Sequence, residues 1–210
     1  MQNTSHAVMA QRVEPSDSRD DFPTPPWATR ALIEHIIGPS NVAEKTCLEP
    51  ACGRGYMVRP LREYFRSVNG SDAFDYGFAG QRDFLRQPYG RGSFDWVITN
   101  PPFRLAEEFV EQSLSIARHG VAILARTVFL ESASRYSAIF KDRPPSVFAQ
   151  FVERVPMVKG RVDPRASTAT GYAWFVWKVG CKERPALAWV PPCRRSLERP
   201  GDYDQYSCLS

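Results

Sequence analysis

The stretch that decides the fold is KTCLEPACGRG, residues 45–55. Its first part, residues 45–50, predicts a short strand. Two glycines near its end allow a tight turn and let the backbone approach a ligand closely. Residues 56–65 then place apolar side chains at helical spacing. A strand that passes through a glycine turn into a helix is typical of α/β folds that bind a nucleotide at the turn.

Strands and helices alternate along most of the chain. Strands are predicted at residues 45–50, 68–72, just before 83, 94–99, 121–125, 147–155 and 172–179. Helices are predicted between Trp27 and Gly38 and over residues 56–65, 106–118 and 128–141. The pattern predicts an α/β fold with a Rossmann-like, doubly wound, mostly parallel seven-stranded sheet. The last two strands have no helix between them, which predicts an antiparallel hairpin at the C-terminal edge.

One domain is expected, flanked by two tails. Residues 1–19 are polar and unpatterned and predict a disordered N-terminal tail. Residues 20–180 carry all the predicted strands and form the expected domain. Residues 181–210 contain four prolines and are expected to be an extended tail.

The composition narrows the class of protein. Hydrophobic residues make up 43% of the chain and charged residues 24%, which is typical of soluble globular proteins. No apolar run approaches the roughly 18 residues of a membrane span, and the N-terminus lacks the apolar core of a signal peptide. The five cysteines are scattered without metal-ligand spacing. We therefore expect a cytoplasmic protein with no bound metal and no membrane partner.

Acidic residues surround the glycine turn. Glu49 precedes it, and Asp72 ends the next predicted strand 17 residues after Gly55, close to the spacing at which doubly wound folds bind a ribose hydroxyl. Asp75 is near enough to take the same role. An acid at the turn repels a phosphate but attracts an ammonium or sulfonium group. Two glycines and an acid therefore favour S-adenosylmethionine (SAM) over a dinucleotide.

A second motif, Asn100-Pro101-Pro102-Phe103, follows the predicted strand 94–99. The prolines fix φ, remove two backbone donors and push the chain out of the sheet in an extended conformation. The Asn100 side chain and the carbonyls of the turn can then point at a ligand, and Phe103 can stack on a flat ring. Such a turn can also be purely structural.

Together the two motifs resemble those of class I SAM-dependent methyltransferases, and the order Thr-Pro, glycine motif, NPPF resembles the gamma arrangement of the DNA adenine-N6 methyltransferases. The resemblance covers about residues 20–180. It implies a cofactor site in which Glu49 and the glycine turn hold the methionine part, Asp72 holds the ribose, and Asp83 and Phe84 hold the adenine. The cofactor residues implied are Thr24, Pro25, Glu49, Pro50, Gly53, Gly55, Asp72, Asp83 and Phe84. Structural alternatives remain open, because Asp83 can cap a turn and Thr24 and Trp27 can be a helix cap and a core anchor.

The resemblance also implies how the acceptor is held. The side-chain oxygen of Asn100 and the carbonyl of Pro101 would accept hydrogen bonds from the exocyclic nitrogen of adenine, with Phe103 stacked on its ring. The catalytic residues are then Asn100, Pro101, Pro102 and Phe103. A base in duplex DNA would have to be flipped out to reach them.

DNA is the expected partner because of a basic stretch. Residues 134–165 contain seven basic and three acidic residues, so seven minus three gives +4, the net charge of the whole chain. Such a stretch can attract phosphates, although a solvated surface is an equally simple interpretation. The substrate-binding residues expected from this stretch are Arg135, Lys159, Arg161 and Arg165.

Three rival functions remain open. RNA adenine or a protein glutamine side chain could occupy the same turn, and a catalytically silent nucleic-acid-binding module could keep the fold. About thirty residues follow residue 180, whereas the adenine methyltransferases usually carry a sizeable target-recognition region there. We therefore expect the region that gives sequence specificity to be short or absent, or its role to be supplied by a partner or by the loop at residues 156–171.

Overall fold

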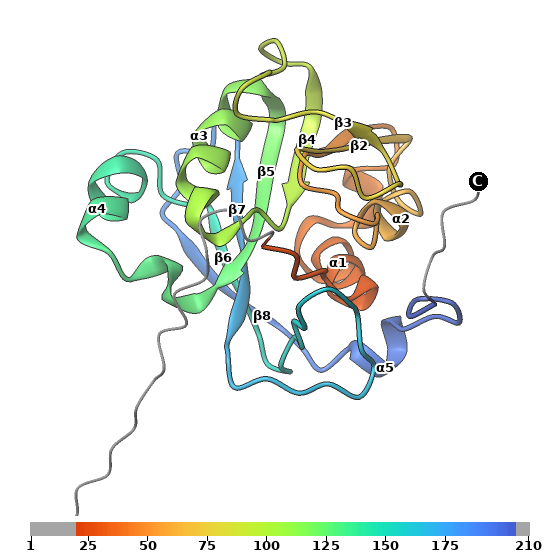
Figure 1. Ribbon diagram of the computed structural model, residues 1–210. Helices are drawn as coiled ribbons and strands as arrows, with labels where there is room; N and C mark the ends of the chain where they lie inside the picture. The colour runs from red at the N-terminus through yellow and green to blue at the C-terminus, as the bar shows by residue number, and fades with distance from the viewer. Residues whose placement is uncertain (1–19, 205–210) are drawn as a thin grey trace, which may run out of the picture.

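The computed structural model describes residues 20–204, so the predicted tail at residues 1–19 lies outside the described residues. The described chain forms one eight-stranded sheet with helices on both faces (Figure 1). The strands are β1 Thr46–Glu49, β2 Ser67–Asp72, β3 Gly80–Gln81, β4 Phe94–Thr99, β5 Ala117–Arg126, β6 Val147–Phe151, β7 Tyr172–Lys178 and β8 Ala186–Val190. Their order is β3-β2-β1-β4-β5-β7-β6-β8.

The strand directions confirm the predicted fold class. Strands β1 to β5 pair in parallel, β7 runs antiparallel between β5 and β6, and β8 pairs in parallel with β6. The predicted antiparallel hairpin is therefore present as β6 and β7. The sheet has eight strands and not seven, because β8 covers the edge that the hairpin was expected to form.

The structure contradicts the prediction of an extended tail over residues 181–210 as far as residue 204. Strand β8 is short and lies between Pro185 and Pro191, and prolines are tolerated beside an edge strand because one side of the strand needs no donors. Helix α5, Arg194–Leu197, follows it.

A cluster of ion pairs around the buried Arg30 anchors the end of the described chain to the core. The guanidinium of Arg30, 3% exposed, lies 2.7 Å from Asp202 and 2.8 Å from Glu63. Its Nη1 also donates to the carbonyl of Leu197 at 2.7 Å. Removing one member of such a cluster leaves a buried charge without its partner. The domain therefore extends to residue 204.

Two helical layers cover the sheet. One layer contains α1 Pro26–Leu32, its π-helical continuation Ile33–Ile37, α2 Val58–Leu61 and α5. The other contains α3 Ala106–Ile116, α4 Ala133–Arg135 and the π-helical turn Tyr136–Phe140. Short 3-10 turns lie at Pro39–Asn41, Phe103–Leu105 and Thr127–Leu130. Each layer has its own apolar core against the sheet, as expected for a doubly wound fold.

Two predicted helices are shorter than expected. The helix over residues 56–65 is reduced to α2, which contains Pro60, and proline removes a backbone donor. The helix over residues 128–141 is divided into a 3-10 turn, α4 and a π-helical turn. Within residues 20–204, no helix has the length and apolar character that a membrane crossing requires.

Candidate functional site

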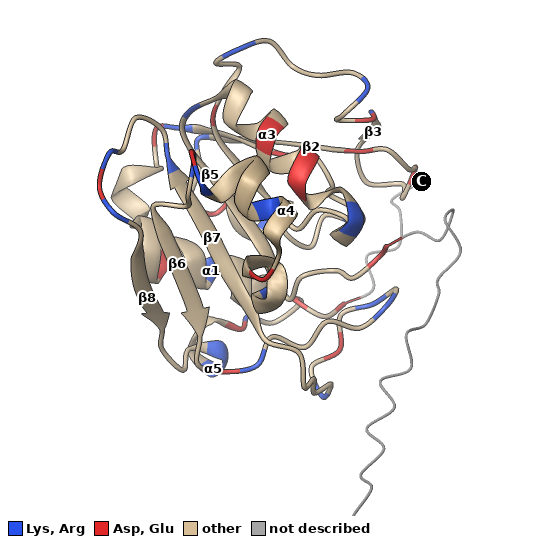
Figure 2. Cartoon of the chain, turned by 90° about the vertical axis from the view of Figure 1, so that its left-hand side faces the viewer, with Lys and Arg blue, Asp and Glu red and all other residues tan. Residues whose placement is uncertain are grey.

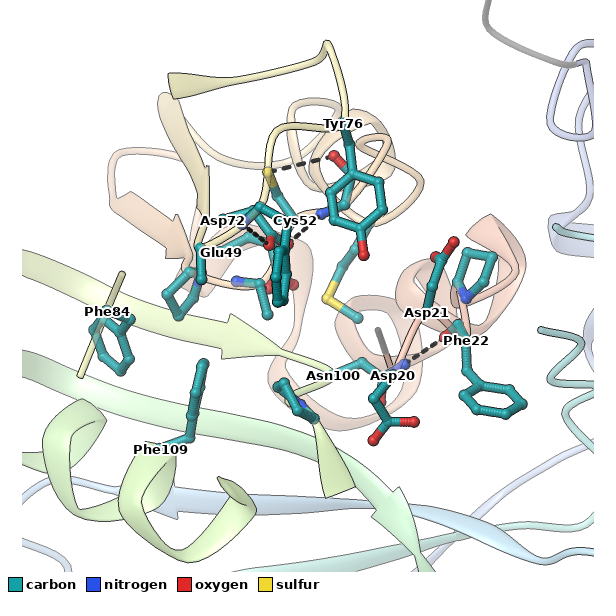
Figure 3. Close-up of a pocket in the computed structure, with 18 of the residues that line it drawn as sticks. Asp20, Asp21, Phe22, Glu49, Cys52, Asp72, Tyr76, Phe84, Asn100 and Phe109 are labelled. Atoms are coloured by element: carbon teal, nitrogen blue, oxygen red, sulfur yellow. Dashed lines mark hydrogen bonds between the residues drawn. The ribbon is translucent and has the colours of Figure 1, made fainter. Parts of the chain in front are cut away.

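A cleft of about 240 Å³ lies at the carboxyl ends of β1, β2 and β4. The glycine turn, the Asn100 turn and the N-terminal segment 20–25, which we call the strap, surround it (Figure 3). Nine of the predicted site residues line it. They are Thr24, Glu49, Pro50, Gly53, Asp72, Asp83, Phe84, Asn100 and Pro102.

The two glycines of the turn have different roles. Gly53 has a φ of 50°, and a Cβ built on it meets no atom within 4 Å, so it borders open space in the cleft. Gly55 has a φ of 82°, and its Cβ would lie 2.3 Å from the ring of Phe78. Gly55 does not line the cleft. It allows the turn to pack on Phe78, and Gly53 leaves room for a ligand.

This difference gives a prediction. Gly55→Ala is expected to lower the free energy of unfolding by more than about 2 kcal/mol, because it adds a steric clash to an unfavourable left-handed φ. Gly53→Ala is the matched control and is expected to cost about 1 kcal/mol, from φ alone. Urea denaturation of both variants measures the difference. Equal losses in the free energy of unfolding of the two variants would show that packing of Phe78 does not require a glycine at residue 55.

Glu49 is a buried acid at the centre of the cleft wall. It is 1% exposed, and its Oε1 accepts hydrogen bonds from the backbone N–H of Ala51 at 2.9 Å and from the hydroxyl of Thr99 at 2.5 Å. Burial raises the pKa of Glu49 to about 8, opposed by these two hydrogen bonds and reinforced by the negative charge of Asp72. A cation bound beside Glu49 would stabilise its carboxylate form.

Of the two acids that could bind a ribose, Asp72 and Asp75, Asp72 is the one that faces the cleft. Its Oδ2 accepts from the N–H of Gly53 at 2.9 Å, and its Oδ1 accepts from the N–H of Phe74 at 2.9 Å. Burial raises the pKa of Asp72, although these backbone donors oppose the shift. Asp75 is exposed, bonds to the N–H of Gly77 and does not line the cleft.

Asp83 and Phe84 lie at the other end of the cleft. Asp83 Oδ1 accepts from the N–H groups of Leu85 at 3.0 Å and Arg86 at 3.2 Å, so it also caps the turn, as the structural alternative had it. Phe84 is 1% exposed, and its ring centroid lies 5.1 Å from that of Phe109. This end of the cleft is therefore apolar with one carboxylate beside it (Figure 3).

The strap joins the two motifs across the cleft. Asp21 forms an ion pair of 2.7 Å with Arg54 in the glycine turn. The carbonyl of Phe22 accepts from Asn100 Nδ2 at 2.8 Å (Figure 3). Asp20 Oδ2 accepts from the N–H of Phe103 at 2.6 Å. Sequence reasoning did not identify Asp20, Asp21 or Phe22 as site residues, although they directly precede the Thr-Pro segment.

Two buried oxygen atoms beside the strap have no hydrogen-bond partner among the described residues. They are Thr24 Oγ1 and Asn100 Oδ1, and both residues line the cleft. A buried polar atom without a partner is costly, so each is suited to bonding a ligand. Thr24 is 3% exposed, whereas Pro25 precedes α1 and does not line the cleft. Trp27 is a core residue, packed edge-on against Phe151 at 5.7 Å.

Pro101 and Phe103 lie on the far side of the same turn. They line a neighbouring hollow of about 130 Å³ together with Arg126, Phe129 and Arg135. The Arg126 guanidinium lies 4.1 Å from the centroid of the Phe103 ring, and the Phe22 ring lies 5.6 Å from it. The ring predicted to stack on the acceptor is thus covered by Arg126 in this structure.

The predicted substrate-binding residues are divided between two places. Arg135 lines the hollow beside Phe103 and pairs with Glu107 at 3.0 Å. Lys159, Arg161 and Arg165 belong to the loop at residues 156–171 and line neither the cleft nor that hollow. The N–H of Gly160 donates to the carbonyl of Asp21 at 2.8 Å, which places the loop against the strap.

Further cleft residues were missed because neither motif assigns them a role. The aromatic segment AFDYGFA, residues 73–79, follows β2, and Tyr76 in it lies under the Arg54 guanidinium at 5.2 Å. This segment could have been predicted as part of the site from its position directly after β2, which ends in Asp72. The other missed residues are Pro23, Ala51, Cys52, Arg54, Tyr56, Met57, Ala73, Phe74, Leu85, Leu105 and Phe109. Among residues 20–204, no group of three or more His, Cys, Asp or Glu side chains is placed to hold a metal ion.

No protein-family model matches the chain, and no curated protein matches it. Solved structures resemble it at low identity. The M protein of the type I restriction enzyme EcoKI aligns with a TM-score of 0.56 and 12% identity over 79% of this chain and 45% of that protein, so this chain spans less than half of it. PH1948 of Pyrococcus horikoshii, a candidate RNA methyltransferase, aligns with a TM-score of 0.52 and 15% identity over 75% and 87%. Atu636 of Agrobacterium tumefaciens, a predicted O-methyltransferase, aligns with a TM-score of 0.51 and 12% identity over 80% and 86%. The described chain therefore has the Rossmann-like α/β fold of these methyltransferases.

Proposed function

We propose that the protein is a SAM-dependent N-methyltransferase that methylates N6 of adenine in DNA. The observation that carries the proposal is the Asn100 side chain, which lines the cleft with its Nδ2 held by the Phe22 carbonyl and its Oδ1 left without a partner. The amide is thereby oriented as an acceptor. The fold and the acids around the glycine turn support SAM as the cofactor.

The residues present in the cleft fit this cofactor. Glu49 and the open space beside Gly53 suit a methionine with its ammonium group, and Asp72 suits the hydroxyls of a ribose. Asp83, Phe84 and Phe109 suit an adenine, which has one polar edge and two apolar faces. Thr24 Oγ1 offers one further hydrogen bond. When bound, SAM supplies an electrophilic methyl group.

The residues of the turn act by holding the acceptor nitrogen. The lone pair of the exocyclic nitrogen of adenine is delocalised into the ring, so the nitrogen is a weak nucleophile. Acceptance of its two N–H hydrogens by Asn100 Oδ1 and the Pro101 carbonyl favours a tetrahedral nitrogen with a free lone pair. The gain is in orientation and in electrostatic fit, and no covalent intermediate with the protein is needed.

Stacking of adenine on Phe103 requires Arg126 to leave the ring face. The guanidinium is exposed and lies at the carboxyl end of β5, so it can turn toward a phosphate of the incoming strand. Such an exchange replaces a cation–π contact with a charge-assisted one. The basic loop beside the strap and the likeness to the EcoKI M protein favour DNA as the acceptor.

The proposal is tested by supplying methyl-labelled SAM with unmethylated DNA, RNA or protein and analysing the products by mass. We expect label in DNA as N6-methyladenine. Label only in RNA or only in protein glutamine would replace adenine in DNA with that acceptor. Binding of SAM without transfer to any of the three would favour a catalytically silent module.

A further inference from the structure

Strand β8, which was not predicted from the sequence, carries an exposed tryptophan. Trp189 on β8 is 63% exposed, whereas Trp27 and Trp174 are fully buried. Its side chain borders a hollow of about 440 Å³ at the ends of β6 and β8. Figure 2 shows these two strands side by side at one margin of the molecule. The hollow is lined by Gln150, Phe151, Val152, Glu153, Arg154, Gly171, Tyr172 and Trp189.

This hollow adjoins the turn proposed to hold the acceptor. Tyr172 is the register partner of Arg126, whose guanidinium covers Phe103. The carbonyl of the preceding residue, Gly171, accepts a hydrogen bond from the N–H of Thr127 at 2.9 Å. A Cβ on Gly171 would lie 3.3 Å from Arg154 Nη1, so the Arg154 guanidinium lies against this backbone. The end of β5 beside Phe103 and the hollow at Trp189 therefore lie along the same edge of the sheet.

The hollow offers one guanidinium and one exposed aromatic ring. Arg154 is exposed and forms no ion pair with another residue in 20–204. Glu153 also lines the hollow, and its Oε2 is held at one side because it accepts from the N–H groups of Cys193 at 2.6 Å and Arg194 at 2.9 Å. One unpaired guanidinium and one exposed indole thus face the same space. Proteins hold unpaired nucleic acid by stacking its bases on aromatic side chains and binding its phosphates with basic ones.

We propose that this hollow holds an unpaired nucleotide of the acceptor DNA strand, a few nucleotides from the adenine at the Asn100 turn, because four strand spacings of about 4.8 Å separate β4 from β8. The base stacks on Trp189, and its phosphate lies on Arg154. This inference rests on the proposed function and adds to it that the acceptor strand is single-stranded beside the target. A second copy of the chain added to the β8 edge fits less well, because Pro185 and Pro191 bound the strand and prolines impede edge-to-edge pairing.

The test compares four variants in the binding of a single-stranded, adenine-containing DNA oligonucleotide, measured by fluorescence anisotropy. Trp189→Ala is expected to raise the dissociation constant about tenfold, the usual range for loss of one stacked base. Trp189→Phe keeps a ring and is expected to restore most of the affinity. Leu187→Ala is the matched control, because Leu187 is 61% exposed on the same strand but does not line the hollow. Arg154→Ala is expected to reduce the slope of log affinity against log salt by about one unit.

The outcomes separate this inference from the proposed reaction. If wild-type protein methylates DNA and Trp189→Ala binds and methylates like wild type, the reaction stands and the nucleotide site is wrong. If no methyl group is transferred but Trp189→Ala still loses DNA binding, the nucleotide site stands and the reaction is wrong. Dependence on Trp189 for RNA alone overturns the assignment to DNA. A concentration-dependent dimer that Trp189→Ala abolishes, with DNA binding unchanged, assigns the surface to a second copy.

Discussion

Asn100→Ala is expected to lower the rate of methyl transfer by about 10²- to 10³-fold, the size of effect seen when one oriented polar group is removed from an active site. The dissociation constant of SAM is expected to change by less than about threefold, because Asn100 serves the acceptor and the cofactor contacts lie elsewhere. Single-turnover transfer to DNA and calorimetric titration with SAM measure the two quantities separately.

The variant also removes the hydrogen bond from Asn100 Nδ2 to the Phe22 carbonyl, so its effect on the strap must be separated from its effect on the acceptor. The strap is held independently by the ion pair of Asp21 with Arg54 and by the bond from the Phe103 N–H to Asp20. A loosened strap would therefore appear first as weaker SAM binding. Loss of transfer with SAM binding retained identifies an acceptor role.

Asn69→Ala is the matched control for this experiment. Asn69 is exposed on β2 and does not line the cleft, so the same change there is expected to leave both transfer and binding as in wild type. Turnover of Asn100→Ala equal to that of wild type would remove Asn100 from the mechanism.

The parts of the fold that were predicted correctly have strong local signals. β4 is a run of six buried residues, and β7 is aromatic and β-branched, so their sequences specify buried strands directly. The glycine turn has two glycines at positive φ, which other residues rarely adopt. Asp72 and Asp83 were placed by their positions after strands, and both line the cleft.

The parts that were missed depend on contacts between distant segments. β8 has only five residues, mostly exposed, and its pairing with β6 is not encoded in its own pattern. Arg126 looks like an ordinary end of a strand, yet its guanidinium covers the ring of Phe103, 23 residues earlier in the sequence. The strap reaches Asn100 and Phe103 through bonds spanning 78 and 83 residues. No local periodicity reports such contacts.

Glu49 gives the second large effect, a pH dependence of cofactor binding. Because burial raises the pKa of Glu49 to about 8, the free protein holds this carboxyl protonated at neutral pH. A bound ammonium group stabilises the carboxylate, so SAM binding should release up to about one proton, and affinity should rise up to about tenfold per pH unit between pH ~6 and ~7.5. The amino group of the cofactor stays mostly protonated in this window, since α-amino groups titrate at about 7.7–8.0.

Glu49→Gln keeps the Oε1 acceptor for Ala51 and Thr99 but cannot ionise. The variant is therefore expected to bind SAM more than about tenfold more weakly at pH ~7.5 and to show no pH dependence. Calorimetry in two buffers with different ionisation enthalpies measures the released proton. Glu44→Gln, at an exposed position, is the matched control.

The same raised pKa predicts the opposite trend for the stability of the free protein. The folded state binds a proton at Glu49 that the unfolded state has released above its usual pKa of 4.5. The free energy of unfolding therefore falls as pH rises from about 5 to about 8. Above pH ~8 the ionisation of Glu49 causes no further change in it. The melting temperature of Glu49→Gln should exceed that of wild type by a margin that widens over this window. The contrary outcome is a constant margin in melting temperature together with a wild-type SAM affinity that does not change from pH ~6 to ~7.5. It would show that Glu49 is ionised in the free protein. Its burial would then be compensated by contacts other than those with Ala51 and Thr99.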